Sequence, residues 1–170
     1  MTLETSLRAP DPNERRDAVA LLNRELGDGA YTDTDLTAPG VTVLATFAGG
    51  TMIGVGVAQE GIDPAAFSRS FKVDLDPQTA CIAALAVEPR ERGRGVAKAI
   101  LAALLGRLQA CPQVIAVRRE KEHDGLDRAS GFRVLASSRD YYARISAEYG
   151  WQCPVCGGPC TCAAVLLGRP

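Results

Sequence analysis

The chain has 170 residues, of which 46% are hydrophobic and 23% are charged, and 19 Lys and Arg against 20 Asp and Glu leave a formal net charge of −1. This composition is typical of one folded domain and excludes a disordered chain, and the near-zero net charge excludes a general attraction to nucleic acid. The most apolar stretch, residues 96–106, is interrupted by Lys98 and is too short to span a bilayer, so we expect no membrane association.

The N-terminal third of the chain is expected to form alternating strands and helices. Residues 12–26 combine an apolar face with a charged face, which predicts an amphipathic helix that ends at Gly27. The Gly49–Gly50 dipeptide lies between two β-rich runs and is typical of a tight hairpin turn. In chain order we predict an edge strand at 3–9, the helix at 12–26, a turn or short helix at 31–39 and a hairpin at 41–59.

Residues 60–78 interrupt this pattern and are long for a plain connection between strands. Connections of this length form walls of binding sites in some proteins and are tolerated surface insertions in others. The sequence leaves both interpretations open.

The middle of the chain predicts a strand, a Gly-rich turn, a helix and a second strand. Residues 79–87 are almost entirely apolar, as expected of a strand that is buried on both faces. A helix at 94–109 and a strand at 113–120 complete a βαβ unit, whose two strands should be parallel. The remaining elements are a short helix near 122–130, a strand at 131–136, an unassigned segment at 138–149 and a final strand at 163–169. The fold class is therefore a mixed α/β sheet with helices on both faces, in a single domain over residues 1–170.

The turn of the βαβ unit carries the pattern R-x-x-G-x-G, from Arg90 to Gly95. Gly93 and Gly95 have no Cβ and let the backbone approach a ligand closely. The first N–H groups of the next helix are unpaired and lie at the positive end of its dipole, which predicts an anion site. The P-loop pattern is absent, and a dinucleotide fingerprint would need Gly or Ala where this chain has Lys98.

Between a buried strand and an Ala/Leu-rich helix, this pattern resembles the signature of the GNAT superfamily of N-acetyltransferases, which use acetyl-CoA. The element order over residues 3–145 and the Gly131–Phe132 pair are also similar to that superfamily. The resemblance implies a mostly antiparallel sheet around a central parallel βαβ unit, whose two parallel strands splay apart to form the cleft. It also implies that the turn holds the coenzyme A pyrophosphate and that the preceding strand pairs with the pantetheine arm. The predicted cofactor-binding residues are Leu85, Ala86, Val87, Arg92, Gly93, Arg94, Gly95, Val96 and Ala97.

The acid and base that are common in the superfamily are not in their usual places. The superfamily commonly has a carboxylate early on the signature strand and a Tyr four residues before the GF glycine, where this chain has Asp127. An alkylamine has a pKa of about 10, so its ammonium form must lose a proton before it attacks a thioester. We predict Glu88 and Tyr142 as catalytic residues, and Asp76, His123 and Tyr141 remain as alternatives.

Four of the six cysteines lie within residues 153–162, in the sequence CPVCGGPCTC. In a reducing compartment such a cluster favours a metal site over disulfides. Four thiolates with no nearby His or carboxylate suit a structural tetrahedral Zn²⁺, although an iron–sulfur cluster or metal-free cysteines remain alternatives. We predict a zinc knuckle at 150–163, inserted before the last strand, with the ligands Cys153, Cys156, Cys160 and Cys162.

Together these features predict an acetyl-CoA-dependent N-acetyltransferase that acts on a primary amine by direct attack in a ternary complex. The alternative is a non-catalytic acyl-CoA-binding or protein-interaction module that uses the zinc knuckle, because the usual acid and base are missing. The expected partner is a small-molecule or peptide amine, a homodimer stays open, and nucleic acid is not expected. The N-terminal residues lack a basic region followed by an apolar run, so we expect a cytoplasmic protein.

Overall fold

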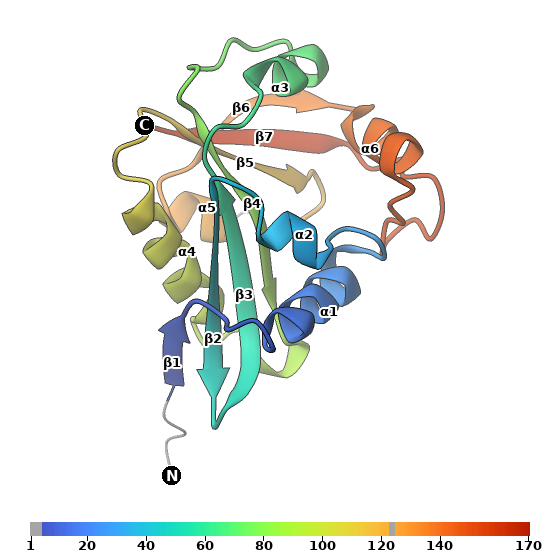
Figure 1. The fold of residues 1–170 in the computed structure, drawn as a ribbon. Coiled ribbons are helices and arrows are strands. Elements are labelled where there is room, and N and C mark those ends of the chain that lie inside the picture. The colour runs from blue at the N-terminus through green and yellow to red at the C-terminus, as the bar shows by residue number, and fades with distance from the viewer. Residues whose placement is uncertain (1–4, 123–124) are drawn as a thin grey trace.

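The structure, a computed structural model, describes residues 5–122 and 125–170. In this part of the chain the strands form one seven-stranded sheet in the order β1-β2-β3-β4-β5-β7-β6 (Figure 1). All neighbouring strands are antiparallel except β4 and β5, which are parallel, as the βαβ unit predicts. The strands are β1 (Thr5–Arg8), β2 (Val41–Ala48), β3 (Thr51–Gln59), β4 (Ala80–Val87), β5 (Val114–Arg119), β6 (Arg133–Ser138) and β7 (Ala164–Arg169).

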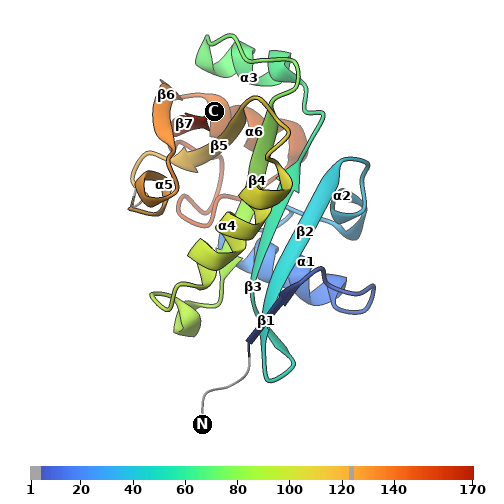
Figure 2. The same cartoon turned by 90° about the vertical axis from the view of Figure 1, so that its left-hand side faces the viewer.

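Helices cover both faces of the sheet, which confirms the predicted fold class (Figure 2). One face carries α4 and α5, and the other carries α1, α2, α3 and α6. None of the helices in the described residues is both long and apolar enough to cross a lipid bilayer. The helices are α1 (Arg15–Leu26), α2 (Asp33–Leu36), α3 (Pro64–Phe71), α4 (Val96–Arg107), α5 (Gly125–Ala129) and α6 (Tyr141–Tyr149), and η1 (Pro89–Glu91) is a short 3₁₀ helix.

Side chains of helix α4 occupy the space where Gly54 and Gly56 of β3 have no Cβ. A Cβ at Gly56 would come within 2.5 Å of the Ile100 side chain and 2.8 Å of that of Leu104. Ile100 and Leu104 are fully buried, so neither has space to move away. The missing side chain of Gly56 therefore sets the position of the helix that follows the Gly-rich turn.

The parallel pair β4–β5 stays together over a short length only. Register pairs run from Ala80 opposite Val114 to Ile82 opposite Ala116, and no pairing between these strands follows in the described residues. Beyond this point β5 continues its pairing with β7, and β4 continues with β3 after a bulge that leaves Ala83 without a β3 partner. The two strands thus splay apart at Ala83, as expected.

Two segments are more regular than the sequence indicated. Residues 60–78 contain α3, and residues 138–149 contain α6. Helix α3 begins with Asp63, whose carboxylate accepts a hydrogen bond from the Ala65 N–H, followed by Pro64 at the first helical position. This Asp-Pro pair is a known start signal of helices and was available in the sequence.

Candidate active site

The splay between β4 and β5 opens into a cavity of about 730 Å³, a size typical of ligand sites. Its wall includes Leu85 of β4, Ala116 of β5, the start of α3, and residues of α5 and α6. Leu126 and Phe132 close it near the α4 face. The cavity therefore follows the gap that the sheet leaves.

The Gly-rich turn lies at the start of α4. Gly93 and Gly95 have φ values of 76° and 84°, a left-handed conformation that favours glycine. Gly95 is the N-cap of α4, and no side chain in residues 5–122 or 125–170 caps the start of this helix. The first N–H groups of α4 are therefore open to a ligand, and an ideal Cβ at either glycine would meet no protein atom within 4 Å.

Ion pairs hold the turn against α1. Arg92 pairs with Glu25 of α1 and donates to the Val87 carbonyl at 3.3 Å, so its side chain joins the turn to α1 and to the end of β4. Arg94 pairs with Glu91 at 2.9 Å within the turn. Among the residues that the structure describes, Arg90 and Lys98 have no ion-pair partner. These two exposed side chains are the cations left for a bound anion.

The structure does not bring the two predicted catalytic residues together. Tyr142 lines the cavity from α6, and burial raises its pKa above the ordinary value of a phenol. Glu88 follows β4, pairs with Arg24 of α1 at 2.6 Å and is not among the residues that line the cavity. Of the alternatives, Tyr141 lines the cavity and Asp76 does not, while His123 lies outside the described residues.

Asp127, which replaces the usual Tyr, lines the cavity from α5. Its carboxylate accepts from Nε of Arg118 at 2.7 Å, across the gap between α5 and β5. Arg118 also donates to the carbonyls of Arg119, Glu120 and Glu122, so it holds the residues that directly follow β5, up to Glu122.

Sequence reasoning missed Tyr31, which lies in the loop between α1 and α2 and lines the cavity. Its hydroxyl donates to the Ala83 carbonyl at 3.1 Å, where β4 leaves β5. Burial raises the pKa of the Tyr31 phenol. No local sequence signal points to this residue, because the contact joins positions 52 residues apart.

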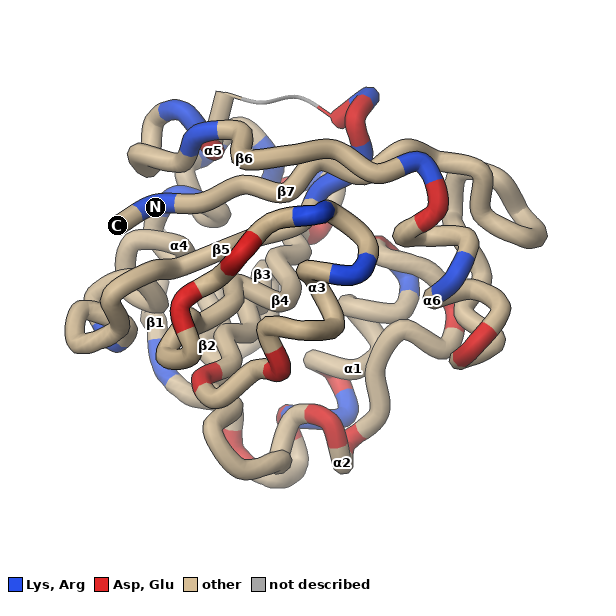
Figure 3. Tube along the Cα trace, turned by 90° about the horizontal axis from the view of Figure 1, so that it is seen from above, with Lys and Arg blue, Asp and Glu red and all other residues tan. Residues whose placement is uncertain are grey.

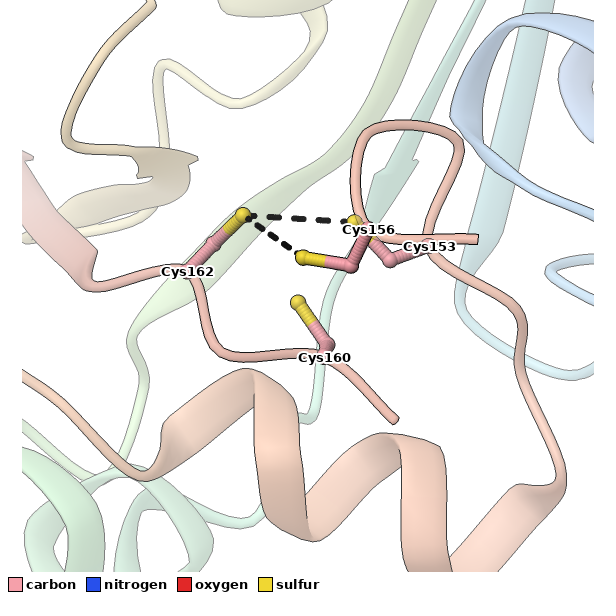
Figure 4. Close-up of side chains that lie close together, drawn as sticks. All are labelled: Cys153, Cys156, Cys160 and Cys162. Atoms are coloured by element: carbon pink, nitrogen blue, oxygen red, sulfur yellow. Dashed lines mark hydrogen bonds between the residues drawn. The ribbon is translucent and has the colours of Figure 1, made fainter. Parts of the chain in front are cut away.

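The four cysteines of residues 153–162 converge in space (Figure 4). Their Sγ atoms all lie within 4.8 Å of one another, and Cys162 Sγ lies 4.0 Å from Cys153 Sγ and 3.6 Å from Cys156 Sγ. Four sulfurs at 2.3 Å from a tetrahedral zinc would be about 3.8 Å apart, so the donor set fits this ion. The backbone N–H and hydroxyl of Thr161 lower the pKa of Cys156 to about 6, which favours the thiolate.

The cysteine segment, residues 150–163 between α6 and β7, packs on the end of α1. The Trp151 indole N–H donates to the Leu26 carbonyl at 3.0 Å, and the Gln152 N–H donates to the Asp28 carbonyl at 3.1 Å. Gly27 makes this approach possible, because a Cβ there would come within 2.1 Å of the Gln152 carbonyl oxygen. The cysteine segment is thereby attached to Leu26 and Asp28, a few residues before Tyr31 in the chain.

Basic and acidic positions are interspersed along the chain, as Figure 3 shows from above. The view shows no broad region of one sign over the elements it labels. Any attraction for an anion is therefore local, as at the Gly-rich turn.

Comparisons with known proteins agree with this geometry. A model of the acetyltransferase (GNAT) family matches residues 9–124. The ribosomal-protein-S18-alanine N-acetyltransferase of Escherichia coli has a TM-score of 0.70 at 16% identity, over 98% of this chain and 94% of that chain. Naa50 of Arabidopsis thaliana, in complex with the bisubstrate analogue CoA-Ac-MVNAL, has a TM-score of 0.69 at 14% identity, over 98% of each chain. A Bacillus subtilis acetyltransferase in complex with CoA has a TM-score of 0.65 at 19% identity, over 98% of this chain and 97% of that one. At these identities the structural likeness establishes the fold alone, and no curated protein sequence matches.

Proposed function

Because the chain belongs to the acetyltransferase (GNAT) family, we propose that it transfers an acetyl group from acetyl-CoA to a primary amine by direct attack in a ternary complex. The observation that carries this proposal is the splay of β4 from β5, which opens a cavity that reaches Leu101 of α4, the helix whose start is uncapped. One cavity can then hold the thioester and the amine side by side, and such proximity accounts for much of the acceleration of an acyl transfer. Structures of the same fold contain CoA or a bisubstrate analogue.

The proposed cosubstrate site has two parts. Main-chain N–H groups from Arg92 to Ala97 bind the pyrophosphate, supported by the positive φ of Gly95 and by the absence of a side-chain cap. The main chain of Leu85 to Val87 pairs with the pantetheine arm, because on its β5 side this edge of β4 has no strand partner beyond Ile82 among the described residues.

The proposed reaction needs no further reactant. The neutral amine attacks the acetyl carbonyl carbon, the carbon–sulfur bond breaks, and the departing thiolate takes a proton to give free coenzyme A. Tyr142 is the proposed proton donor, because its phenol lines the cavity from α6 and is protonated at neutral pH. The proton that the amine loses passes to water. Glu88 stays a prediction for the base, and its ion pair with Arg24 outside the cavity lining argues against that role.

The proposed role of the cysteine segment is a structural zinc knuckle. Four clustered thiol groups, two of them from fully buried cysteines, match a closed Zn²⁺ site with no open position for chemistry. With zinc bound, Cys153, Cys156, Cys160 and Cys162 would hold residues 150–163 in the conformation that packs on α1. The knuckle would then support one wall of the cavity, since Trp151 lines it.

The test is to mix the protein with acetyl-CoA and a panel of amines and to measure the release of free thiol. We expect acetyl-CoA to bind and at least one amine to be acetylated at a rate well above hydrolysis. Binding of acetyl-CoA without turnover on any amine would favour the non-catalytic module instead. Failure to bind coenzyme A at all would refute both functions.

A further inference from the structure

The aromatic residues of this chain are concentrated around the cavity. The chain has four Phe, four Tyr and one Trp, and all of them except Phe47 and Phe71 line the cavity. The core on the α4 face is instead built almost entirely from aliphatic and small side chains. The rings are therefore concentrated where this face of the core borders the cavity.

Four of these rings form a continuous aromatic wall, defined here as Phe67, Tyr141, Tyr142 and Trp151. Phe67 stacks on Tyr141 with ring centroids 6.3 Å apart, and Tyr141 meets Tyr142 edge-on at 5.2 Å. Tyr142 packs against Trp151 at 5.6 Å. Because all four line the cavity, the wall offers an aromatic ligand the offset and edge contacts that rings prefer.

Tyr31 adds a fifth ring next to β4, the strand that the proposed function assigns to the pantetheine arm. Its hydrogen bond to the Ala83 carbonyl fixes it beside the fork between β4 and β5. An apolar group that packs on Tyr31 and the aromatic wall is thus held next to the edge of β4.

The charged groups that line the cavity are mostly paired with one another. Arg118 pairs with Asp127 at 2.7 Å, and Arg119 pairs with Glu122. Among the described carboxylates of the lining, Asp63, which accepts the capping hydrogen bond from the Ala65 N–H, is the one with no ion-pair partner in the described chain. A ligand with one ammonium group is matched by one carboxylate, whereas a polyamine or an aminoglycoside would bring several charges into an aromatic cavity without partners.

We propose that the acceptor is a primary amine carried on one aromatic or bulky apolar group, which packs on Tyr31 and the aromatic wall. This inference rests on the proposed function, because the amine must meet the acetyl group in the same cavity. A free arylalkylamine and the N-terminal aromatic residue of a peptide share this chemistry.

Trp151 gives a readout that does not depend on turnover, because it is the only Trp of the chain and belongs to the aromatic wall. Its fluorescence is followed while protein saturated with coenzyme A is titrated with 2-phenylethylamine or with ethylamine. We expect a saturable change with 2-phenylethylamine at concentrations at least about tenfold below those that ethylamine needs.

Thiol release from acetyl-CoA is measured with the same amines, with spermidine, and with two tripeptides, Phe-Gly-Gly and Ala-Gly-Gly. We expect 2-phenylethylamine to have a lower KM than ethylamine, and Phe-Gly-Gly a lower KM than Ala-Gly-Gly. Whichever of 2-phenylethylamine and Phe-Gly-Gly has the lower KM then shows whether the acceptor is a free arylalkylamine or the N-terminus of a peptide. The variant Tyr31→Leu should raise the KM for 2-phenylethylamine at least about fivefold. Phe47→Leu, which removes a ring outside the cavity, should leave that KM within about twofold.

Each outcome separates this inference from the proposed function. Acetylation of ethylamine or spermidine with a KM equal to or below that of 2-phenylethylamine supports the function and overturns the inference. A Trp151 response to 2-phenylethylamine without any transfer shows that the cavity binds the aromatic amine, but it refutes catalysis and with it the role of that amine as acceptor. Binding of acetyl-CoA with neither a Trp151 response nor acetylation of an aromatic amine overturns the inference.

Discussion

The indole of Trp151 packs against the phenol ring of Tyr142, with ring centroids 5.6 Å apart and an interplanar angle of 35°. Trp151 lies in the cysteine segment, and Tyr142 is the proposed proton donor. Cys153 and Cys160 pack in the same buried cluster, together with Ala30 from the loop after α1. The cysteine segment and the proposed catalytic cavity are therefore neighbours and share this aromatic contact.

Replacing Gly27 by Ala should detach the cysteine segment from α1. The new Cβ would lie 2.1 Å from the Gln152 carbonyl oxygen and 2.5 Å from the Trp151 indole nitrogen, at a φ of 121° that disfavours any side chain. We expect the free energy of unfolding to fall by about 3 kcal/mol, with a red shift of Trp151 fluorescence. Gly29→Ala is the matched control, because Gly29 also has a positive φ but open space around it. The free energy of unfolding of both variants is measured by urea denaturation. Equal losses of this free energy would contradict the close contact between Gly27 and the cysteine segment.

Zinc should be present at about one ion per chain, as elemental analysis of the purified protein can show. Cys160→Ser should abolish this binding, because Cys160 is fully buried within the four-sulfur cluster. Cys111→Ser removes a cysteine outside the cluster and should leave the metal content unchanged. A stably folded wild-type protein that contains neither zinc nor iron would rule out the metal site.

Gly95→Glu should abolish coenzyme A binding. The variant places a negative side chain at the open start of α4, where the pyrophosphate is proposed to bind, and forces a non-glycine residue to a φ of 84°. Gly50→Glu carries the same charge change at a φ of 81° in the β2–β3 hairpin and controls for backbone strain. Calorimetric titration with coenzyme A should show no heat for the first variant and a near wild-type affinity for the second. Equal affinities would place the anion site elsewhere.

Tyr142→Phe should lower kcat by about 10²-fold or more while the KM for acetyl-CoA changes little, as expected when a proton donor is lost. Tyr141→Phe is the matched control, since it removes the neighbouring hydroxyl of the same aromatic wall. A larger loss in the Tyr141 variant would transfer the role to that residue.

The prediction that Glu88 is the base is tested by comparing the variants Glu88→Gln and Arg24→Gln. If Glu88 is the base, only its own replacement lowers kcat strongly. If the ion pair between them serves only to hold β4 against α1, the two variants have similar and small effects on kcat.

The stability of the protein should fall at alkaline pH partly because of Cys81. Burial raises the pKa of this thiol from its ordinary value of 9.0 to about 12, so it stays neutral in the folded protein while it ionises in the unfolded chain. Between pH 9 and 12 the unfolded state therefore binds fewer protons, and the free energy of unfolding decreases as the pH rises. Urea denaturation at pH 8 and pH 10.5 should show a smaller decrease for Cys81→Ala than for the wild type. An identical decrease would mean that Cys81 is not buried as the structure has it.

The sequence by itself determined the parts of this protein that depend on residues close together in the chain. The R-x-x-G-x-G turn, the hairpin at Gly49–Gly50 and the βαβ unit are local patterns, and each is present where it was expected. The convergence of four cysteines within ten positions is local in the same sense, because short loops bring such residues together at little entropic cost.

Only the tertiary structure decided what surrounds the cavity. Tyr31 meets Ala83, Trp151 meets Leu26, and Glu88 pairs with Arg24, and the residues of each pair are separated by 52, 125 and 64 positions. No spacing rule predicts such contacts, because they result from how α1, α6 and the cysteine segment pack on one face of the sheet. For the same reason the sequence proposed Glu88 and Tyr142 as a pair, whereas the packing places the first against α1 and the second in the cavity.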